Sequence, residues 1–389
     1  MNRKINGDRL HGLDALRAIA MFLGVVLHAA IAYKVVAIPT WPHDSDSTNY
    51  CWDYLYAFIH SFRMPLFYLI AGFFCRMLFN KIGEQAFVQH RIKRIVIPFV
   101  CSVIILLPLT IFPFLLYKNL LNTNWDWSTS ISLSGKQVLR WNGMAHFWFL
   151  YYLIFYYVAF IVFSRITRLP AFKAKTERIT TVIRNNDRWN IYLMAGCIAI
   201  ITVLLLLHKE LLFGVDTGII PNPVYLTFYG LFFFAGCLIN IRPAYFDFIK
   251  RNAYALLVPG VIISGLSFYL EFLLAAPADE QWHRLLIKIL FAVQCVLLVN
   301  GFLGLFLRLF VRDSAMWRYF SDASYWVYLL HLGIIAMLQI WLVNKPILSG
   351  VKFGIVLTTT TAICLITYHL LVRFTIIGKY LHGERKKSQ

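Results

Sequence analysis

Charged and titratable side chains lie inside long apolar stretches of this 389-residue sequence. Arg17 and His28 lie in the first stretch, and His60 and Arg63 lie in the second. Such groups are costly in hydrocarbon, and they mark functional sites where they occur. Histidine exchanges a proton near neutral pH, and arginine binds carboxylates or phosphates through paired hydrogen bonds. These residue types therefore indicate acid–base or nucleophilic chemistry beside a site for an anion.

Arg17 and His28 are eleven positions apart. On an α-helix, at about 100° per residue, they share nearly one face and lie roughly 16 Å apart along the axis. Asp14 precedes Arg17 by three residues on the same face. A snorkelling anchor explains Arg17 alone, and a neutral histidine bonded between helices explains His28 alone. Together the two residues predict a cation near one membrane surface and a base nearer the other.

The second apolar stretch carries its polar residues at a similar depth, in the run from His60 to Phe67. Pro65 and Gly72 are expected to distort this helix and to free backbone groups. Arg63 lies about three turns from the outer end, where snorkelling accounts for it poorly. A buried arginine needs an anionic partner or a wet cavity, whereas His60 is also explained as a structural residue.

Arg91 and Arg94 precede the third apolar stretch. Their i, i+3 spacing places both on one helical face, as in a phosphate-binding pair, although an ordinary cationic flank has the same spacing. Further candidates for substrate contacts lie at the start of the fourth stretch and in the ninth: His146, Trp148, Tyr325, Tyr328 and His331. The alternative for these residues is interhelical hydrogen bonding and aromatic packing.

The elements that position these residues are transmembrane helices. Hydrophobic residues make up 60% of the chain and charged residues 14%, with a mean hydropathy of +0.66, which requires lipid as the solvent for the apolar surface. We predict an all-α polytopic bundle forming a single domain over residues 1–389. Its ten spans are placed at about 13–37, 52–79, 95–117, 146–164, 191–208, 224–241, 253–274, 285–309, 323–344 and 351–374.

The formal net charge of +19 follows the loops. Lys and Arg fall in alternate loops and Asp and Glu in the others, which predicts that both termini are cytoplasmic. This pattern also argues against nucleic acid as the partner of the basic residues. The basic segment 165–190 is predicted to be a cytoplasmic connector. The outer loop 118–145, with Trp125, Trp127 and Trp141, is interpreted either as a sugar platform or as an interfacial hairpin.

The cysteines and glycines indicate no second chemistry. Seven cysteines are widely spaced with no Cys-x-x-Cys, so neither a disulfide framework nor a metal site is predicted. The sequence contains no Gly-x-Ser-x-Gly, no His-Glu-x-x-His and no nucleotide-binding glycine loop.

The ordered set of motifs resembles the acyltransferase 3 family of membrane O-acyltransferases. Arg17 and His28 match its arginine–ten residues–histidine signature, and Arg91 and Arg94 match its Arg-x-x-Arg motif. The segments similar to its other landmarks are Phe62-Arg63-Met64-Pro65-Leu66-Phe67, Ala71-Gly72-Phe73, His146-Phe147-Trp148-Phe149-Leu150 and Ser324-Tyr325-Trp326-Val327-Tyr328-Leu329-Leu330-His331. The resemblance covers nearly the whole chain. The stretch 58–64 is similar to the branch that succinylates osmoregulated periplasmic glucans.

The resemblance implies an enzyme of the bacterial inner membrane. Its donor would be cytoplasmic acyl-coenzyme A, with succinyl favoured over acetyl, and its acceptor a hydroxyl of a periplasmic glucan or other glycan. Arg17, Arg91 and Arg94 would hold the coenzyme A phosphates, and His28 would act as general base or carry the acyl group. His60 or Arg63 would orient His28, stabilise the oxyanion or bind a succinyl carboxylate. An oligomer is compatible with this reading.

A transporter or exporter of a glycan or small organic anion is the alternative. Ten spans and intramembrane charge suit it equally well. It does not explain why cytoplasmic Arg91 and Arg94 accompany a histidine in the outer half of the bundle. A membrane scaffold without chemistry leaves Arg63 unexplained.

Overall fold

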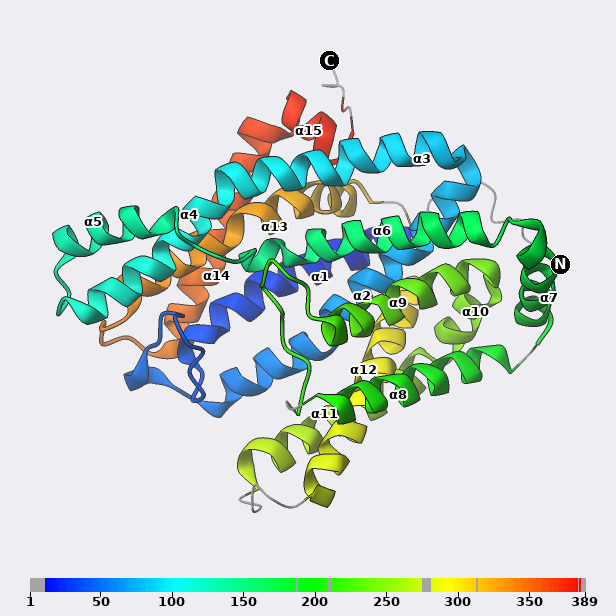
Figure 1. Cartoon of the computed structure of the whole chain (residues 1–389). Helices are drawn as coiled ribbons and strands as arrows, with labels where there is room; N and C mark the ends of the chain where they lie inside the picture. Colours follow the sequence, from blue (N-terminus) through cyan, green and yellow to red (C-terminus); the bar gives the residue numbers. More distant parts are fainter. Residues whose placement is uncertain are drawn as a thin grey trace.

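The computed structural model describes residues 11–186, 188–208, 211–274, 281–312, 314–383 and 385, and these contain helices but no strand. Most helices run side by side (Figure 1). The α-helices are α1 (His11–Ala30), α2 (Tyr50–Ile82), α3 (Glu84–Arg91), α4 (Ile97–Asn122), α5 (Trp127–Val138), α6 (Trp148–Ile166), α7 (Pro170–Asn185), α8 (Trp189–Leu207), α9 (Pro223–Ile241), α10 (Ala244–Arg251), α11 (Ala253–Phe268), α12 (Gln281–Leu309), α13 (Ala315–Leu342), α14 (Ser349–Thr367) and α15 (Ile376–Leu381).

Ten helical segments of the described ranges are long and apolar enough to cross a membrane, which confirms the predicted all-α fold and span number. The segments extend beyond the predicted limits in places. The third runs from Glu84 to Asn122, because α3 and α4 are joined by a π turn at Ile92–Val96. The ninth begins at Ala315, eight residues before the predicted start, and Trp317 in its first turn packs edge-on against Phe310.

Both long connecting segments contain a helix. α5 lies in the loop 118–145 and packs against α4, and α7 forms most of the segment 165–190. In Figure 1, α7 crosses the ends of the neighbouring helices instead of running along them. Arg242 fixes α7 in this position, since its guanidinium donates to the carbonyl oxygens of Ile183, Arg184 and Asn186 at the C-terminal end of that helix.

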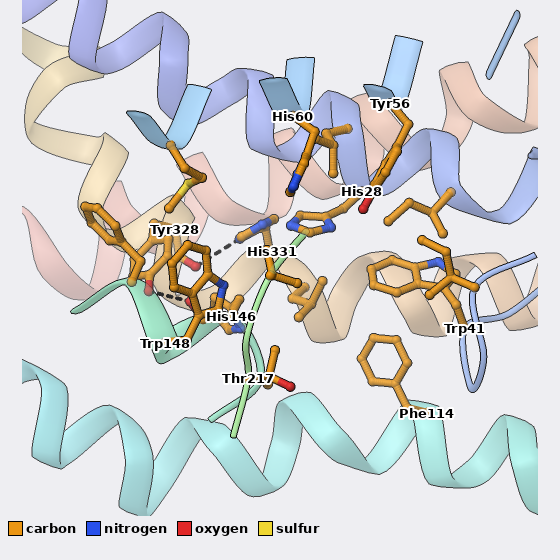
Figure 2. Close-up of a pocket in the computed structure, with 18 of the residues that line it drawn as sticks. His28, Trp41, Tyr56, His60, Phe114, His146, Trp148, Thr217, Tyr328 and His331 are labelled. Carbon is orange, nitrogen blue, oxygen red and sulfur yellow. Dashed lines mark hydrogen bonds between the residues drawn. The ribbon is translucent and has the colours of Figure 1, made fainter. Parts of the chain in front are cut away.

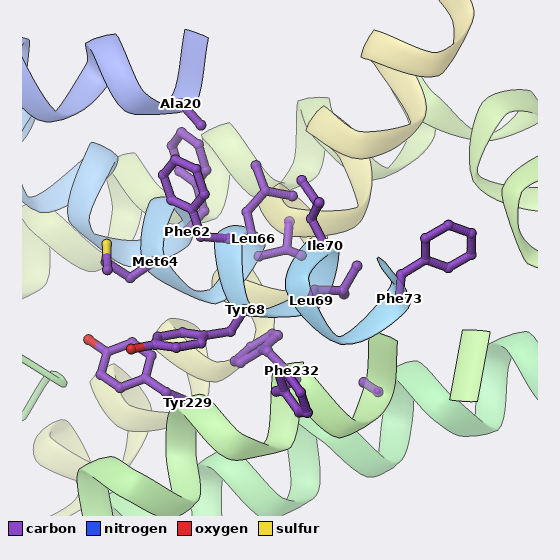
Figure 3. Close-up of a cluster of buried hydrophobic side chains, with 14 of the residues drawn as sticks. Ala20, Phe62, Met64, Leu66, Tyr68, Leu69, Ile70, Phe73, Tyr229 and Phe232 are labelled. Carbon is purple, nitrogen blue, oxygen red and sulfur yellow. The ribbon is translucent and has the colours of Figure 1, made fainter. Parts of the chain in front are cut away.

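α2 lies at the centre of the apolar core. Figure 3 shows its side chains packed between α1, α9 and α12, with Phe62, Tyr68 and Phe232 almost completely buried. Pro65 lies inside α2 and does not end the helix, which continues to Ile82. Gly72 instead allows a close crossing, because a Cβ there would lie 1.8 Å from the carbonyl oxygen of Phe233 in α9. Small residues permit such contact between membrane helices.

α1 packs against α2 on one side and α13 on another. Its last turns therefore face the His60–Arg63 turn of α2 and the His331 turn of α13. The three helices bring residues from the start, the first quarter and the end of the chain to one region of the bundle.

Candidate active site

A cavity of about 300 Å³ opens at the end of the bundle where the α1–α2, α5–α6 and α8–α9 connections meet. Figure 2 shows histidines from α1, α2 and α13 directed into this outer cavity. Seven residues predicted to form the site line it: His28, His60, Arg63, His146, Trp148, Tyr328 and His331. Among the described residues that line it, none is Asp or Glu, so no carboxylate there balances the charge of Arg63.

Arg63 lies against the backbone of α1. A Cβ built on Gly24, one turn before His28, would lie 2.0 Å from Nη1 of Arg63. The absence of a side chain at Gly24 therefore provides the space for the guanidinium. The Nε of Arg63 is buried and has no hydrogen-bond partner in the described part of the chain. A cation placed in this way attracts an anionic ligand or the developing charge of an oxyanion.

His28 is held between an aromatic ring and another imidazole. Trp41 stacks on it with ring centroids 5.4 Å apart and an interplanar angle of 14°, and His331 lies at 5.3 Å. The Trp41 indole donates to Oε1 of Gln339 at 2.9 Å. The amide of Gln339 in turn donates to the carbonyl oxygens of His28 and Ala29, both at 3.1 Å. Gln339 thus fixes both Trp41 and the end of α1.

His60 is held by different partners. Its Nε2 lies 3.1 Å from the carbonyl oxygen of Phe213, so this nitrogen carries the hydrogen. The Tyr56 ring stacks on it at 5.4 Å with an interplanar angle of 7°. His60 therefore lines the cavity with an orientation set by the α8–α9 connection and by Tyr56.

His146, Trp148 and Tyr328 form the wall opposite α2. Tyr328 donates from its hydroxyl to the carbonyl oxygen of His146 at 2.7 Å, which joins α13 to the turn before α6. Both ring nitrogens of His146 are buried and lack a partner among the described residues. Trp148 packs on Tyr229 with centroids 5.0 Å apart. In the described ranges, no three His, Cys, Asp or Glu side chains are grouped so as to hold a metal ion.

A second cavity, of about 790 Å³, opens towards the beginning of α1 and the end of α2. Arg17, Arg91 and Tyr325 line this inner cavity. The guanidinium of Arg91 lies over the rings of Phe87 and Tyr157, at 4.9 and 4.7 Å from their centroids. These rings support Arg91 without neutralising it, so its hydrogen-bond donors are available to an anion.

Arg94 is not among the residues that line the inner cavity. Its guanidinium lies against Gly383, where an added Cβ would be 2.9 Å from Nη2. Arg94 lies in the π turn at Ile92–Val96, so this segment departs from the α-helical geometry on which the i, i+3 prediction rests. Arg17 and Arg91 therefore share the lining of the inner cavity, whereas Arg94 contacts the chain near Gly383.

Four side chains separate the two cavities. Met21, Phe67, Phe149 and Tyr328 line both cavities, and each of the three rings is at least 90% buried. The ring centroids of Phe67 and Phe149 are 5.7 Å apart, and those of Phe149 and Tyr328 are 5.9 Å apart. These four residues form a partition between cavities that open at opposite ends of the bundle.

The α1–α2 connection closes part of the outer cavity, which Ile38, Pro39, Thr40 and Trp41 line. Two buried ion pairs hold the connection in place: Lys352 with Asp44, and Lys34 with Asp53 at 3.9 Å. Lys34 also lies 4.2 Å above the Tyr56 ring. Burial lowers the pKa of Lys34, and the nearby Asp53 carboxylate opposes that shift.

The sequence did not indicate Gly24, Trp41 or Gln339 as residues of the site. The sequence alone could have indicated Gln339, because a single amide side chain in an apolar helix usually forms a hydrogen bond with another helix. Of the three tryptophans of the outer loop, only Trp141 lines the outer cavity. Trp125 and Trp127 pack on each other, with centroids 6.4 Å apart. Trp141 is thus the tryptophan of this loop that lies at the candidate site.

The fold and the two cavities define a multi-pass membrane protein. Its inner cavity is lined by arginines, its outer cavity is lined by histidines, and the two share lining residues inside the bundle. The sequence model of the acyltransferase 3 family, described as an acyltransferase domain, matches residues 10–369. The chain therefore belongs to this family and is a membrane acyltransferase. Membership favours acyl transfer over the export alternative.

Named relatives of the chain include glucans biosynthesis protein C from Salmonella paratyphi B, Salmonella dublin and Salmonella enteritidis. Each is 25% identical over 386 residues, which is 96% of this chain and 96% of the relative. No solved structure matches the chain.

Proposed function

We propose that this acyltransferase is an O-acyltransferase of the bacterial inner membrane, with both termini in the cytoplasm. It transfers a short acyl group from acyl-coenzyme A to a hydroxyl of a periplasmic glucan or related glycan. The observation that carries the proposal is the pair of cavities that open at opposite ends of the bundle. They share four lining residues, and His28 lines the outer cavity. The name of the relatives supports glucan as the acceptor.

The donor enters the inner cavity in this proposal. Arg17 and Arg91 bind the phosphate groups, with Arg94 at the edge of the site, because guanidinium groups pair with phosphate in bidentate geometry. The pantetheine arm then passes the partition of Met21, Phe67, Phe149 and Tyr328. Tyr325 lines the inner cavity, through which the donor passes, and does not line the outer cavity. The thioester reaches the outer cavity next to His28.

The transfer step takes place in the outer cavity. His28 removes the proton of the acceptor hydroxyl as that oxygen attacks the thioester carbonyl, or it first carries the acyl group itself. Arg63 and His60 face the developing oxyanion. His146, Trp148, Tyr328 and His331 contact the acceptor, and Trp141 provides an aromatic face at the mouth of the cavity.

Succinyl is the favoured acyl group and acetyl the next. Arg63 supports this order, because its cationic side chain has no acidic neighbour among the cavity-lining residues and suits a free carboxylate. The same cation also suits an oxyanion, which every acyl donor forms. An experiment in which succinyl-coenzyme A and acetyl-coenzyme A compete is therefore needed to determine the preferred donor.

The test of the function uses purified full-length protein in lipid nanodiscs. Succinyl-coenzyme A and acetyl-coenzyme A are supplied together with a glucan acceptor, and mass spectrometry identifies the product. We expect release of coenzyme A thiol that depends on the acceptor, and a glucan modified mainly by succinyl. Mainly acetylated glucan would reverse the donor order, and an unmodified glucan with either donor would overturn the proposal.

Arg91→Ala is expected to weaken binding of the acyl donor by about tenfold or more, since it removes a charge-assisted contact of about 1.5–3 kcal/mol. Arg94→Ala is the matched comparison and is expected to have a smaller effect, because Arg94 does not line the inner cavity. Isothermal titration with a non-reactive coenzyme A thioether measures both affinities. Equal affinity in the wild type and in Arg91→Ala would remove Arg91 from the donor site.

A further inference from the structure

His331 is the imidazole that lies against His28. The two ring centroids are 5.3 Å apart with an angle of 41° between the ring planes. Figure 2 shows both rings in the same part of the outer cavity, one from α1 and one from α13. His331 is 4% exposed, so its orientation is fixed by the surrounding protein. His60, by contrast, is bonded to the Phe213 carbonyl and stacked on Tyr56.

The contacts of His331 determine which of its nitrogens carries the hydrogen. Its Nδ1 lies 3.0 Å from the carbonyl oxygen of Val327 and 2.9 Å from that of Tyr328. Carbonyl oxygens only accept hydrogen bonds, so Nδ1 is the protonated nitrogen of the neutral ring. Nε2 is therefore a lone-pair acceptor. It is buried and has no partner among the residues that the structure describes.

His28 offers the complementary group. Its Nδ1 is also buried and without a partner in the described ranges. A buried polar atom that makes no hydrogen bond destabilises the fold, which calls for an explanation in function. An Nδ1–H on His28 and a lone pair on Nε2 of His331 satisfy each other after a small approach of the rings. His146 also faces His331, at 5.4 Å and 81°, and so competes for the same lone pair.

We infer that His331 is a positioning residue for His28. Its Nε2 accepts the Nδ1–H of His28 and so leaves the lone pair of His28 on Nε2, facing the acceptor hydroxyl. An oriented third group of this kind fixes the tautomer of a catalytic base and stabilises the imidazolium that forms. Gln339 and Trp41 hold the same end of α1, so that only the imidazole of His28 needs to be oriented. This role rests on the proposed function and deepens it.

The chemical step balances with a thioester donor and a hydroxyl acceptor. The O–H bond of the acceptor breaks, and its proton moves to Nε2 of His28 while the oxygen–acyl bond forms. The carbon–sulfur bond then breaks, and the proton passes from His28 to the leaving thiolate. His331 stays neutral throughout and exchanges no proton.

His331→Phe and His331→Gln test this role in the full-length protein. Phenylalanine fills the space without an acceptor, and the amide oxygen of glutamine restores one. We expect the phenylalanine variant to lower kcat by about 10²-fold or more with little change in KM for the acyl donor, since a base in the wrong tautomer loses most of its activity. We expect glutamine to recover at least tenfold of that loss. His369→Phe, at an exposed position that lines neither cavity, is the control.

Two kinetic outcomes would overturn the inference while the wild type transfers acyl groups. One is full activity of the phenylalanine variant, and the other is an equal loss in the phenylalanine and glutamine variants. Absence of transfer by the wild type, with either donor, would instead remove the proposed function. Nitrogen-15 NMR of the histidine rings tests the wild type directly, with His28 assigned by comparison with His28→Gln. A hydrogen on Nδ1 of His28 supports the role of His331, and a hydrogen on Nε2 overturns it.

Discussion

Replacing His28 with alanine is expected to lower kcat for acyl transfer by about 10²–10⁴-fold, which is the usual contribution of a positioned general base. His28 is the one titratable side chain that combines three features of the site. It lines the outer cavity, it lies beside Arg63 across Gly24, and it is fixed by Trp41 and by the contacts of Gln339. The measurement is the initial rate of glucan acylation at saturating donor. Thermal unfolding in the same nanodiscs checks the fold.

The control for His28→Ala is His369→Ala. His369 lies in the π turn Tyr368–Val372, is exposed, and lines neither cavity, so its removal is expected to leave the rate unchanged. His28→Gln refines the test, because glutamine keeps the volume and polarity but cannot take up a proton. We expect it to be as inactive as the alanine variant. Full activity of His28→Ala would remove His28 from the mechanism.

The architecture was largely predictable because lipid leaves few alternatives. A chain in hydrocarbon must satisfy its backbone internally, so each apolar run long enough to cross becomes a helix. That argument does not apply at the membrane surface. There α7 carries basic residues beside Phe172 and Ile179, so its composition predicts a polar connector and no helix. The early start of α13 was missed because its first turns are polar.

The sequence predicted how deep in the membrane the residues of the candidate site lie, but not which residues of other helices they contact. Tyr325 and Tyr328 share a helical face, as their spacing indicates, yet Tyr325 lines only the inner cavity. Three residues rise about 4.5 Å along a helix, which is enough to place Tyr325 in the inner cavity and Tyr328 at the partition. Spacing within one helix also cannot reveal that His28 lies against His331, because that contact depends on the packing of α1 on α13.

The structure also changes how the arginines are understood. The sequence predicts four arginines at two depths in the membrane: Arg17, Arg63, Arg91 and Arg94. In space Arg63 lies alone in the outer cavity, whereas Arg17 and Arg91 share the inner one. In the proposed function, the anionic donor held by the inner pair would meet a second cation, Arg63, beyond the partition. Under that proposal Arg63 would attract the free carboxylate of a succinyl group towards His28, so the position of Arg63 is important.

Gly24→Ala is expected to lower acyl transfer by about 10²-fold, because a displacement of about 1 Å at an active site has that effect. The added Cβ would lie 2.0 Å from Nη1 of Arg63, whereas ordinary contacts at a Cβ are 3.4–4 Å. The guanidinium must therefore move away from α1 and from His28. Alanine in a helix is otherwise favourable by about 0.5–1 kcal/mol relative to glycine, so the variant should lose activity without losing thermal stability.

Gly196→Ala in α8 is the matched control for this substitution, since no atom lies within 4 Å of a Cβ at Gly196. A double-mutant cycle identifies the cause of the loss. If Gly24→Ala acts through Arg63, the double variant Gly24→Ala/Arg63→Gln is expected to be no slower than Arg63→Gln alone, because the clash disappears with the guanidinium. Additive losses in the two variants would show that Gly24 affects the site by another route. A wild-type rate for Gly24→Ala would mean that Arg63 tolerates displacement and does not act at a fixed position beside His28.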